Sequence, residues 1–138
     1  MSEPFIFIGT HRLKEGKLDA FRTGCIGLAE FVETNEPRMI AFNFYSNEDG
    51  TEVSVVQVHP DADSMLFHMQ LLHEHITTAF DEEGSLDVTT SVQVYGTPTE
   101  AVLEMIRQLS QEGVPLIVKP LGLGGFTRSA AEQTLSPS

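Results

Sequence analysis

The sequence has no tryptophan, one cysteine and few positive charges. The single cysteine, Cys25, excludes a disulfide within the chain. Eight Lys and Arg stand against 20 Asp and Glu, which gives a formal net charge of -12. So acidic a chain repels nucleic acid and anionic membranes, because both attract clusters of positive charge. No apolar run is long enough to span a bilayer, so we expect neither kind of partner.

The first residues, Met-Ser-Glu-Pro, lack the positive start and the apolar run of a secretory signal. We therefore expect a cytoplasmic protein. A chain of 138 residues with 41% hydrophobic residues has the size and composition of one globular domain. Its core is large enough to form without a metal ion or a disulfide.

Apolar periodicity predicts an alternation of strands and helices. Helix-period stripes and β-rich runs place strands at residues 4–10, 38–46, 52–59 and 87–96, and helices at residues 15–35 and 61–80. Cys25 falls within the apolar stripe of the first helix, which favours a buried structural thiol over a nucleophile. Both faces of the first strand are apolar, so both should be covered.

Asp49-Gly50 marks a tight hairpin between the second and third strands, since this pair accepts positive φ angles. With these two residues as the loop, Tyr45 pairs with Ser54, and Asn43 with Val56. One face of the hairpin is then fully apolar, with Phe42, Phe44, Val53 and Val55. The other face carries Asn43 and Tyr45, and is polar enough to line a pocket or a wet interface.

The resulting β-α-β-β-α-β order predicts an α+β, ferredoxin-like fold with an antiparallel sheet. Residues 1–96 form this core. Residues 97–138 add a helix capped by Thr97, a short edge strand at residues 114–118 and an extended arm of the same domain. Two helices cover one face of a four-stranded sheet, so we expect a homodimer whose sheets face each other. Alternatively, the third helix and the arm cover the second face within one chain.

Two stretches carry a family resemblance: residues 13–21 (LKEGKLDAF), and residues 59–64 (HPDADS) followed by His68 and His73. Over residues 4–96 the chain resembles the dimeric α/β barrel superfamily and, within it, the antibiotic-biosynthesis-monooxygenase-like proteins. Glu15 stands where that family usually has proline, and the tryptophan of several active members is absent. The resemblance implies cofactor-independent oxidation of quinols or polycyclic phenols by O2. Other members degrade haem, and many have no assigned activity.

Three histidines lie on the helix expected at residues 61–80. On a helical wheel His68 and His75 share one flank of the apolar stripe, and His73 lies on the other. No pair has the four-residue spacing of a helical zinc site, so the helix alone should not bind metal. A site made of His68, His59 and a carboxylate from another segment stays open. His59 and His11 sit at strand ends, where we expect solvent.

The candidate catalytic residues are His68, Asn43 and Tyr45. His68 would act as the general base, because a neutral imidazole titrates near the operating pH, and the other two would orient the substrate oxygen. The expected substrate pocket comprises His73, Met65, Phe42 and Leu72, and no cofactor or metal is expected. The alternatives are a non-catalytic dimer that binds a ligand or is structural, with His68 at the rim of the core, and a haem-binding relative with His68 or His73 as the iron ligand.

Overall fold

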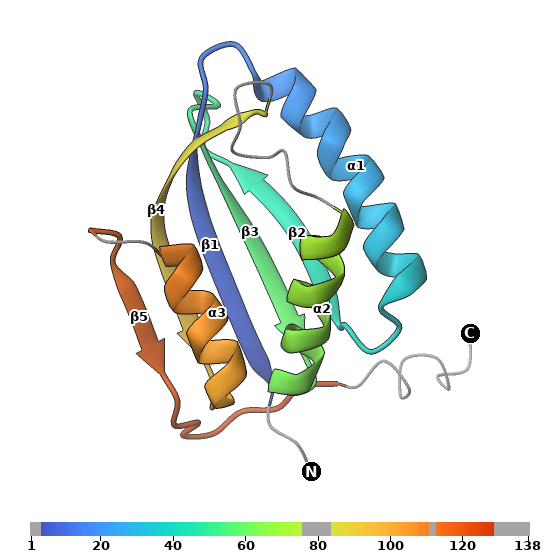
Figure 1. Ribbon diagram of the computed structural model, residues 1–138, viewed down its shortest axis with the longest axis vertical. Coiled ribbons are helices and arrows are strands. Elements are labelled where there is room, and N and C mark those ends of the chain that lie inside the picture. The colour runs from blue at the N-terminus through green and yellow to red at the C-terminus, as the bar shows by residue number, and fades with distance from the viewer. Residues whose placement is uncertain (1–3, 76–83, 111–112, 129–138) are drawn as a thin grey trace.

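The computed structural model describes residues 4–75, 84–110 and 113–128, and it confirms the predicted order of elements (Figure 1). The elements are β1 (Phe5–Leu13), α1 (Leu18–Asn35), β2 (Ala41–Ser46), β3 (Glu52–His59), α2 (Ala62–His75), β4 (Leu86–Tyr95), α3 (Glu100–Ser110) and β5 (Leu116–Lys119). The last five residues of the helix expected at 61–80 lie outside the described residues.

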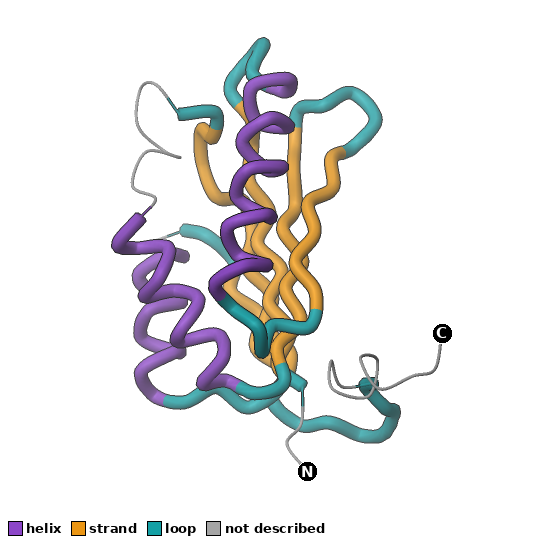
Figure 2. Tube along the Cα trace, turned by 90° about the vertical axis from the view of Figure 1, so that its right-hand side faces the viewer, coloured by secondary structure: helices purple, strands orange, loops and turns teal. Residues whose placement is uncertain are grey.

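The strands form one five-stranded sheet in the order β2-β3-β1-β4-β5. The first four are antiparallel neighbours, which is the ferredoxin-like arrangement, and β5 is added parallel to β4 at the edge. The strand β1 is therefore central. Its two apolar faces predicted that both would be covered, and the described helices cover only one of them (Figure 2). The edge position of β5 was also predicted, because Pro115 and Pro120 flank it.

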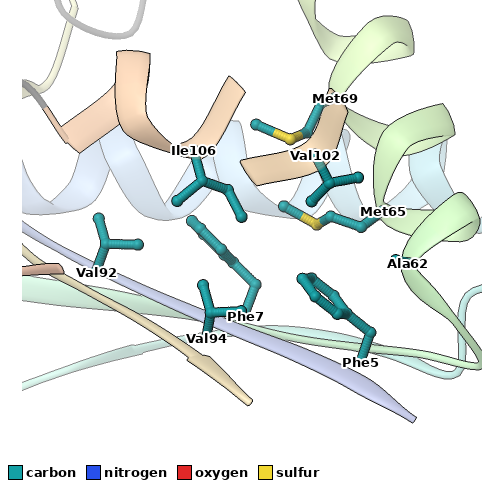
Figure 3. Packing of buried hydrophobic residues seen from close by; sticks show 9 residues of the cluster. All are labelled: Phe5, Phe7, Ala62, Met65, Met69, Val92, Val94, Val102 and Ile106. Carbon is teal, nitrogen blue, oxygen red and sulfur yellow. The ribbon is translucent and has the colours of Figure 1, made fainter. Parts of the chain in front are cut away.

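All three helices lie on one face of the sheet, and no described helix covers the opposite face, which is called the bare face below (Figure 2). The main core lies under α2 and α3, where the methionines of α2 meet phenylalanines of β1 (Figure 3). Its members are Phe5, Phe7, Ala62, Met65, Met69, Val92, Val94, Val102 and Ile106. Side chains alternate along a strand, so this core uses only one face of each strand.

The β2–β3 hairpin has the predicted register, with Tyr45 opposite Ser54 and Asn43 opposite Val56. The turn is longer than the assumed two residues. The amide of Gly50 donates to the carbonyl of Asn47 at 3.1 Å, and Gly50 has a φ of 72°. The extra residues extend the loop symmetrically, so the pairing does not shift and each side chain keeps its predicted face.

Two helix starts are fixed by side-chain caps. Asp61 precedes α2 and its Oδ1 accepts from the amide of Ser64 at 3.0 Å, which is the N-cap geometry. For α3 the predicted cap, Thr97, is wrong. Thr99 caps instead, accepting from the amide of Val102 at 3.2 Å, while Thr97 donates to the carbonyl of Pro120 at 3.1 Å.

The bare face has an apolar centre, made by Ile6 and Ile8 of β1 and Val56 and Val58 of β3, which lie beside one another in the register. These side chains are only half-buried. Residues 120–128 continue past β5 as an arm without helix or strand, and they carry Leu121, Leu123 and Phe126 exposed to solvent. Among the described helices, none is long and apolar enough to cross a membrane.

Candidate functional site

A cavity of about 440 Å³ lies between the helices and the covered face of the sheet. Its wall is largely aromatic and thioether, with Phe21 from α1, Phe42 and Phe44 from β2, and Met65 and Met69 from α2. The three phenylalanines meet edge to face, with ring centroids 4.9 and 5.9 Å apart. Such a wall suits a planar apolar ligand, because ring faces and sulfur atoms pack well against π systems.

His68 also lines this cavity, and it is paired with a carboxylate that the sequence did not single out. Nδ1 of His68 lies 2.6 Å from Oε2 of Glu36, and both side chains are 2% exposed. Glu36 is the C-cap of α1, where its amide donates to the carbonyl of Val32. A carboxylate can only accept, so the pair holds the His68 proton on Nδ1 and leaves the Nε2 lone pair available.

Both members of the pair carry an unsatisfied atom. Nε2 of His68 and Oε1 of Glu36 are enclosed and have no hydrogen-bond partner among the described residues. A buried polar atom without a partner costs free energy. The imidazole therefore carries an enclosed acceptor with no described partner, in a side chain that lines the cavity.

His59 was expected in solvent at the strand end, and this expectation is wrong. Its side chain is fully buried (0% exposed) because the first turn of α2 folds over the end of β3. Nδ1 lies 2.8 Å from Oγ of Ser64, and Nε2 lies 3.0 Å from Oε1 of Gln57. Burial lowers the pKa of His59 to about 3, so the ring is neutral at pH 7.

His11 is also less exposed than expected. It lines the cavity from β1, and its Nδ1 lies 3.0 Å from Oγ1 of Thr89 on β4. Burial lowers the pKa of His11 to about 4. The cavity wall therefore includes a second imidazole that stays neutral near pH 7.

The structure brings only part of the predicted site together. Four of the predicted pocket residues line the cavity with His68: Phe42, Met65, Leu72 and His73. The ring of Phe42 lies 5.2 Å from that of His68. Asn43 and Tyr45 alternate with Phe42 and Phe44, so they project from the bare face, and Tyr45 is 60% exposed. Within one chain they cannot orient a ligand at His68.

The described residues contain no group of three or more His, Cys, Asp or Glu side chains placed to hold a metal ion. Both ring nitrogens of His59 are engaged by Ser64 and Gln57. Cys25 is half-buried and lines a second cavity between α1 and β2. Burial raises the pKa of its thiol to about 11, so it stays protonated and is a poor nucleophile.

Solved structures share this arrangement of strands and helices. MupZ from Pseudomonas fluorescens superposes with a TM-score of 0.67 at 22% identity, over 91% of this chain and 95% of that one. A protein from Chloroflexus aurantiacus, provisionally named an antibiotic biosynthesis monooxygenase, gives 0.52 at 13% identity over 67% and 90%. The chain shares the fold of these proteins. The predicted resemblance is therefore confirmed for the fold.

Rv0793 from Mycobacterium tuberculosis shares the fold too, with a TM-score of 0.56 at 17% identity over 72% of this chain and 99% of that one. No family model and no curated protein matches the sequence. Identities this low show a shared fold and no residue roles. The chemistry of the site has to come from the cavity, the Glu36–His68 pair and the buried His59 cluster.

Proposed function

We propose that the protein is a cofactor-independent monooxygenase-like enzyme that acts on an aromatic or quinol-type small molecule. The observation that carries the proposal is the apolar cavity beside His68, whose ring is oriented by Glu36. An imidazole with one nitrogen held by a carboxylate and the other unpaired is the arrangement of a general base. Two of the solved neighbours are provisionally named antibiotic biosynthesis monooxygenases, which adds support.

The chemistry begins when Nε2 of His68 takes the proton of a phenolic or quinol hydroxyl. The O–H bond breaks, its electron pair stays on the oxygen, and the resulting anion gives electrons to O2 more readily than the neutral form. A hydroquinone then loses two protons and two electrons in all. O2 takes up the two electrons and the two protons and becomes hydrogen peroxide. In a monooxygenation, one oxygen atom enters the substrate and the other leaves as water. The substrate supplies the electrons in both cases.

Oxygen uptake by purified protein across a panel of hydroquinones tests this function. We expect uptake above the rate of spontaneous oxidation, and a loss of about 100-fold or more of the catalysed rate in His68→Ala, which is the scale of general-base catalysis. Glu36→Gln should lose less, because the base remains and only its orientation weakens. Glu33→Gln is the control, since Glu33 lies on the same helix that Glu36 terminates but is exposed and does not line the cavity. No uptake across the panel would favour a binding or structural role.

The assembly we propose is a homodimer formed through the bare sheet faces. The face has an apolar centre, and its few charges, such as Arg12 and Glu52, lie toward one end of β1 and β3. In such a dimer Asn43 and Tyr45 would lie in the interface and not in the cavity beside His68. Analytical ultracentrifugation at micromolar concentration should show a dimer, and Val56→Lys should dissociate it. A stable monomer of the unaltered protein would contradict this assembly.

A further inference from the structure

Gln57 is a buried polar residue of β3 that has no role in the proposed chemistry. It lies on the covered face of the strand, two residues after Val55. Its side chain is buried and lines the cavity. A glutamine in that position costs free energy unless its amide makes hydrogen bonds. Its neighbours in the sheet are Phe7 of β1 and Phe42 of β2, directly opposite on either side, and neither offers a side-chain partner.

A chain of hydrogen bonds behind Gln57 fixes the direction of its amide. The backbone amide of Ser64 donates a hydrogen bond to Oδ1 of Asp61 at 3.0 Å, which fixes the position of Ser64. The hydroxyl of Ser64 is hydrogen-bonded to Nδ1 of His59. The carbonyl oxygen of Gln57 can only accept, so Nε2 of His59 carries the proton and donates to it at 3.0 Å. Nδ1 of His59 then accepts from the hydroxyl of Ser64. The amide oxygen of Gln57 is thereby turned toward His59.

The amide nitrogen of Gln57 consequently turns away from His59. It has no hydrogen-bond partner among the described residues. Unlike Oε1 of Glu36 and Nε2 of His68, this nitrogen is not fully enclosed. Gln57 therefore presents an accessible N–H donor at the cavity wall. An N–H donor held in place by buried groups is pre-organised, so it needs little rearrangement to meet a ligand.

The donor and the base are neighbours. The ring of His59 lies 5.8 Å from that of His68, between centroids, and its Nε2 bonds Gln57. Phe42 pairs with Gln57 across the strands, and its ring contacts His68. With two shared neighbours on the same face of the sheet, Gln57 and His68 border one region of the cavity. A ligand oxygen placed there meets the Gln57 donor, and a small rotation of the enclosed His68 ring would bring its Nε2 to the same oxygen.

We propose that Gln57 is a catalytic residue that donates a hydrogen bond to the substrate oxygen as that oxygen gives its proton to His68. His59 is the positioning residue that aims the amide. The inference rests on the proposed function and narrows its substrate: a phenol or enol whose oxygen becomes anionic beside Gln57. The hydroxyl proton moves to Nε2 of His68, and the oxygen keeps the electron pair and accepts from Nε2–H of Gln57. The donor lowers the energy of the anion more than that of the neutral hydroxyl.

The test uses 4-nitrophenol, whose visible absorption reports its ionisation. Bound to the unaltered protein, the dye should ionise at lower pH than in solution. Gln57→Leu keeps the side-chain size and removes the donor, so it should raise the pKa of the bound dye by about one unit and weaken nitrophenolate binding about ten-fold. Binding of 4-nitroanisole, which cannot ionise, should not change. Gln57→Met serves as a second variant if the leucine variant unfolds.

His59→Leu should raise the pKa of the bound dye as Gln57→Leu does, although Gln57 is present. His59→Gln keeps a donor toward Gln57, so the pKa of the dye should return most of the way to its value in the unaltered protein. The matched control is Gln108→Leu, because Gln108 lines the same cavity from α3 but is exposed. An unshifted dye, no dye binding, or an equal change in Gln108→Leu would overturn the inference. Loss of oxygen uptake in His68→Ala would still stand in that case. Conversely, a dye shift that needs Gln57 without any oxygen uptake would retain the donor and reject the oxidase chemistry.

Discussion

The two halves of the helix layer pack against the sheet in different ways. Under α2 and α3 the side chains are sealed, with Val94, Val102 and Ile106 completely buried. Of the α1 residues only Val32 is buried, and Phe21 borders both cavities. One part of the layer is a close-packed core, and the part where α1 meets α2 encloses the larger cavity, which Phe21, Met65 and His68 all line.

This difference assigns separate tasks to the two halves. The packed half fixes α2, and with it the backbone that carries His68, since close-packed cores resist displacement. The open half leaves room for a ligand. Glu36 joins them, because it terminates α1 and bonds to His68 on α2. The base is therefore anchored from both halves although only one of them is densely packed.

The largest expected effect comes from removing the same side chain in each half. Phe5→Ala empties a site in the packed core, where Phe5 is 1% exposed, and should lower the free energy of unfolding by about 3–5 kcal/mol. Phe21→Ala should cost about 1 kcal/mol, because that ring already borders open space. Urea unfolding of both variants measures the difference. Equal losses would mean that the half under α1 is packed in solution.

Breaking the link between the halves should have a smaller effect. Glu36→Ala leaves His68 buried without its partner and should cost about 3 kcal/mol. Glu36→Gln retains a hydrogen-bonding group of the same size and should cost about 1 kcal/mol. Asp87→Asn is the control, because Asp87 and Arg12 form an exposed pair at 3.8 Å and such pairs contribute little. If Glu36→Ala lowers the free energy of unfolding no more than the control does, the Glu36–His68 pair is exposed to water in solution.

The smallest effect is the dependence of stability on pH. His59 has a pKa of about 3 in the folded protein, below its unfolded value, so the unfolded chain binds a proton first as the pH falls. The contribution of the neutral ring is complete above pH 6.5 and is lost toward pH 3. Between pH 6.5 and 5, this group alone should lower the free energy of unfolding by about 2 kcal/mol.

His59→Gln should flatten that slope, which urea unfolding at several pH values would measure. His11, with a pKa of about 4, acts in the same direction and remains in the variant. His73→Gln, at an exposed position, is the control. A slope unchanged by His59→Gln would show that the ring is reached by water, and would weaken the contrast between the halves.

Local signals in the sequence were sufficient for the fold. Alternation along β2 and β3, with Asp49-Gly50 between them, predicted the correct register and the correct two faces. His68 was nevertheless grouped with Asn43 and Tyr45, which lie on the other face of the sheet from Phe42. An amphipathic helix covers the face that is apolar throughout, so His68 had to lie beside Phe42 and not beside Asn43.

Glu36 and the buried state of His59 were missed because both depend on distant segments. A glutamate before Pro37 at a helix end normally lies in water, and its partner is 32 residues away. His59 ends a strand, and only the packing of α2 decides whether that end is covered. One local signal was available: Gln57 and His59 occupy the same alternating positions as Val53 and Val55. Polar residues on an otherwise apolar strand face are candidates for a buried hydrogen-bonded cluster.

The central place of β1 has a consequence for synthesis on the ribosome. Its residues leave the ribosome before those of any other strand, yet Phe5 pairs with His59, and Ile6 pairs with Tyr95. At ordinary translation speeds, Ile6 waits on the order of ten seconds for its partner on β4. During that time an apolar strand has at least one edge unpaired, so the nascent chain should bind chaperones there until β4 has emerged.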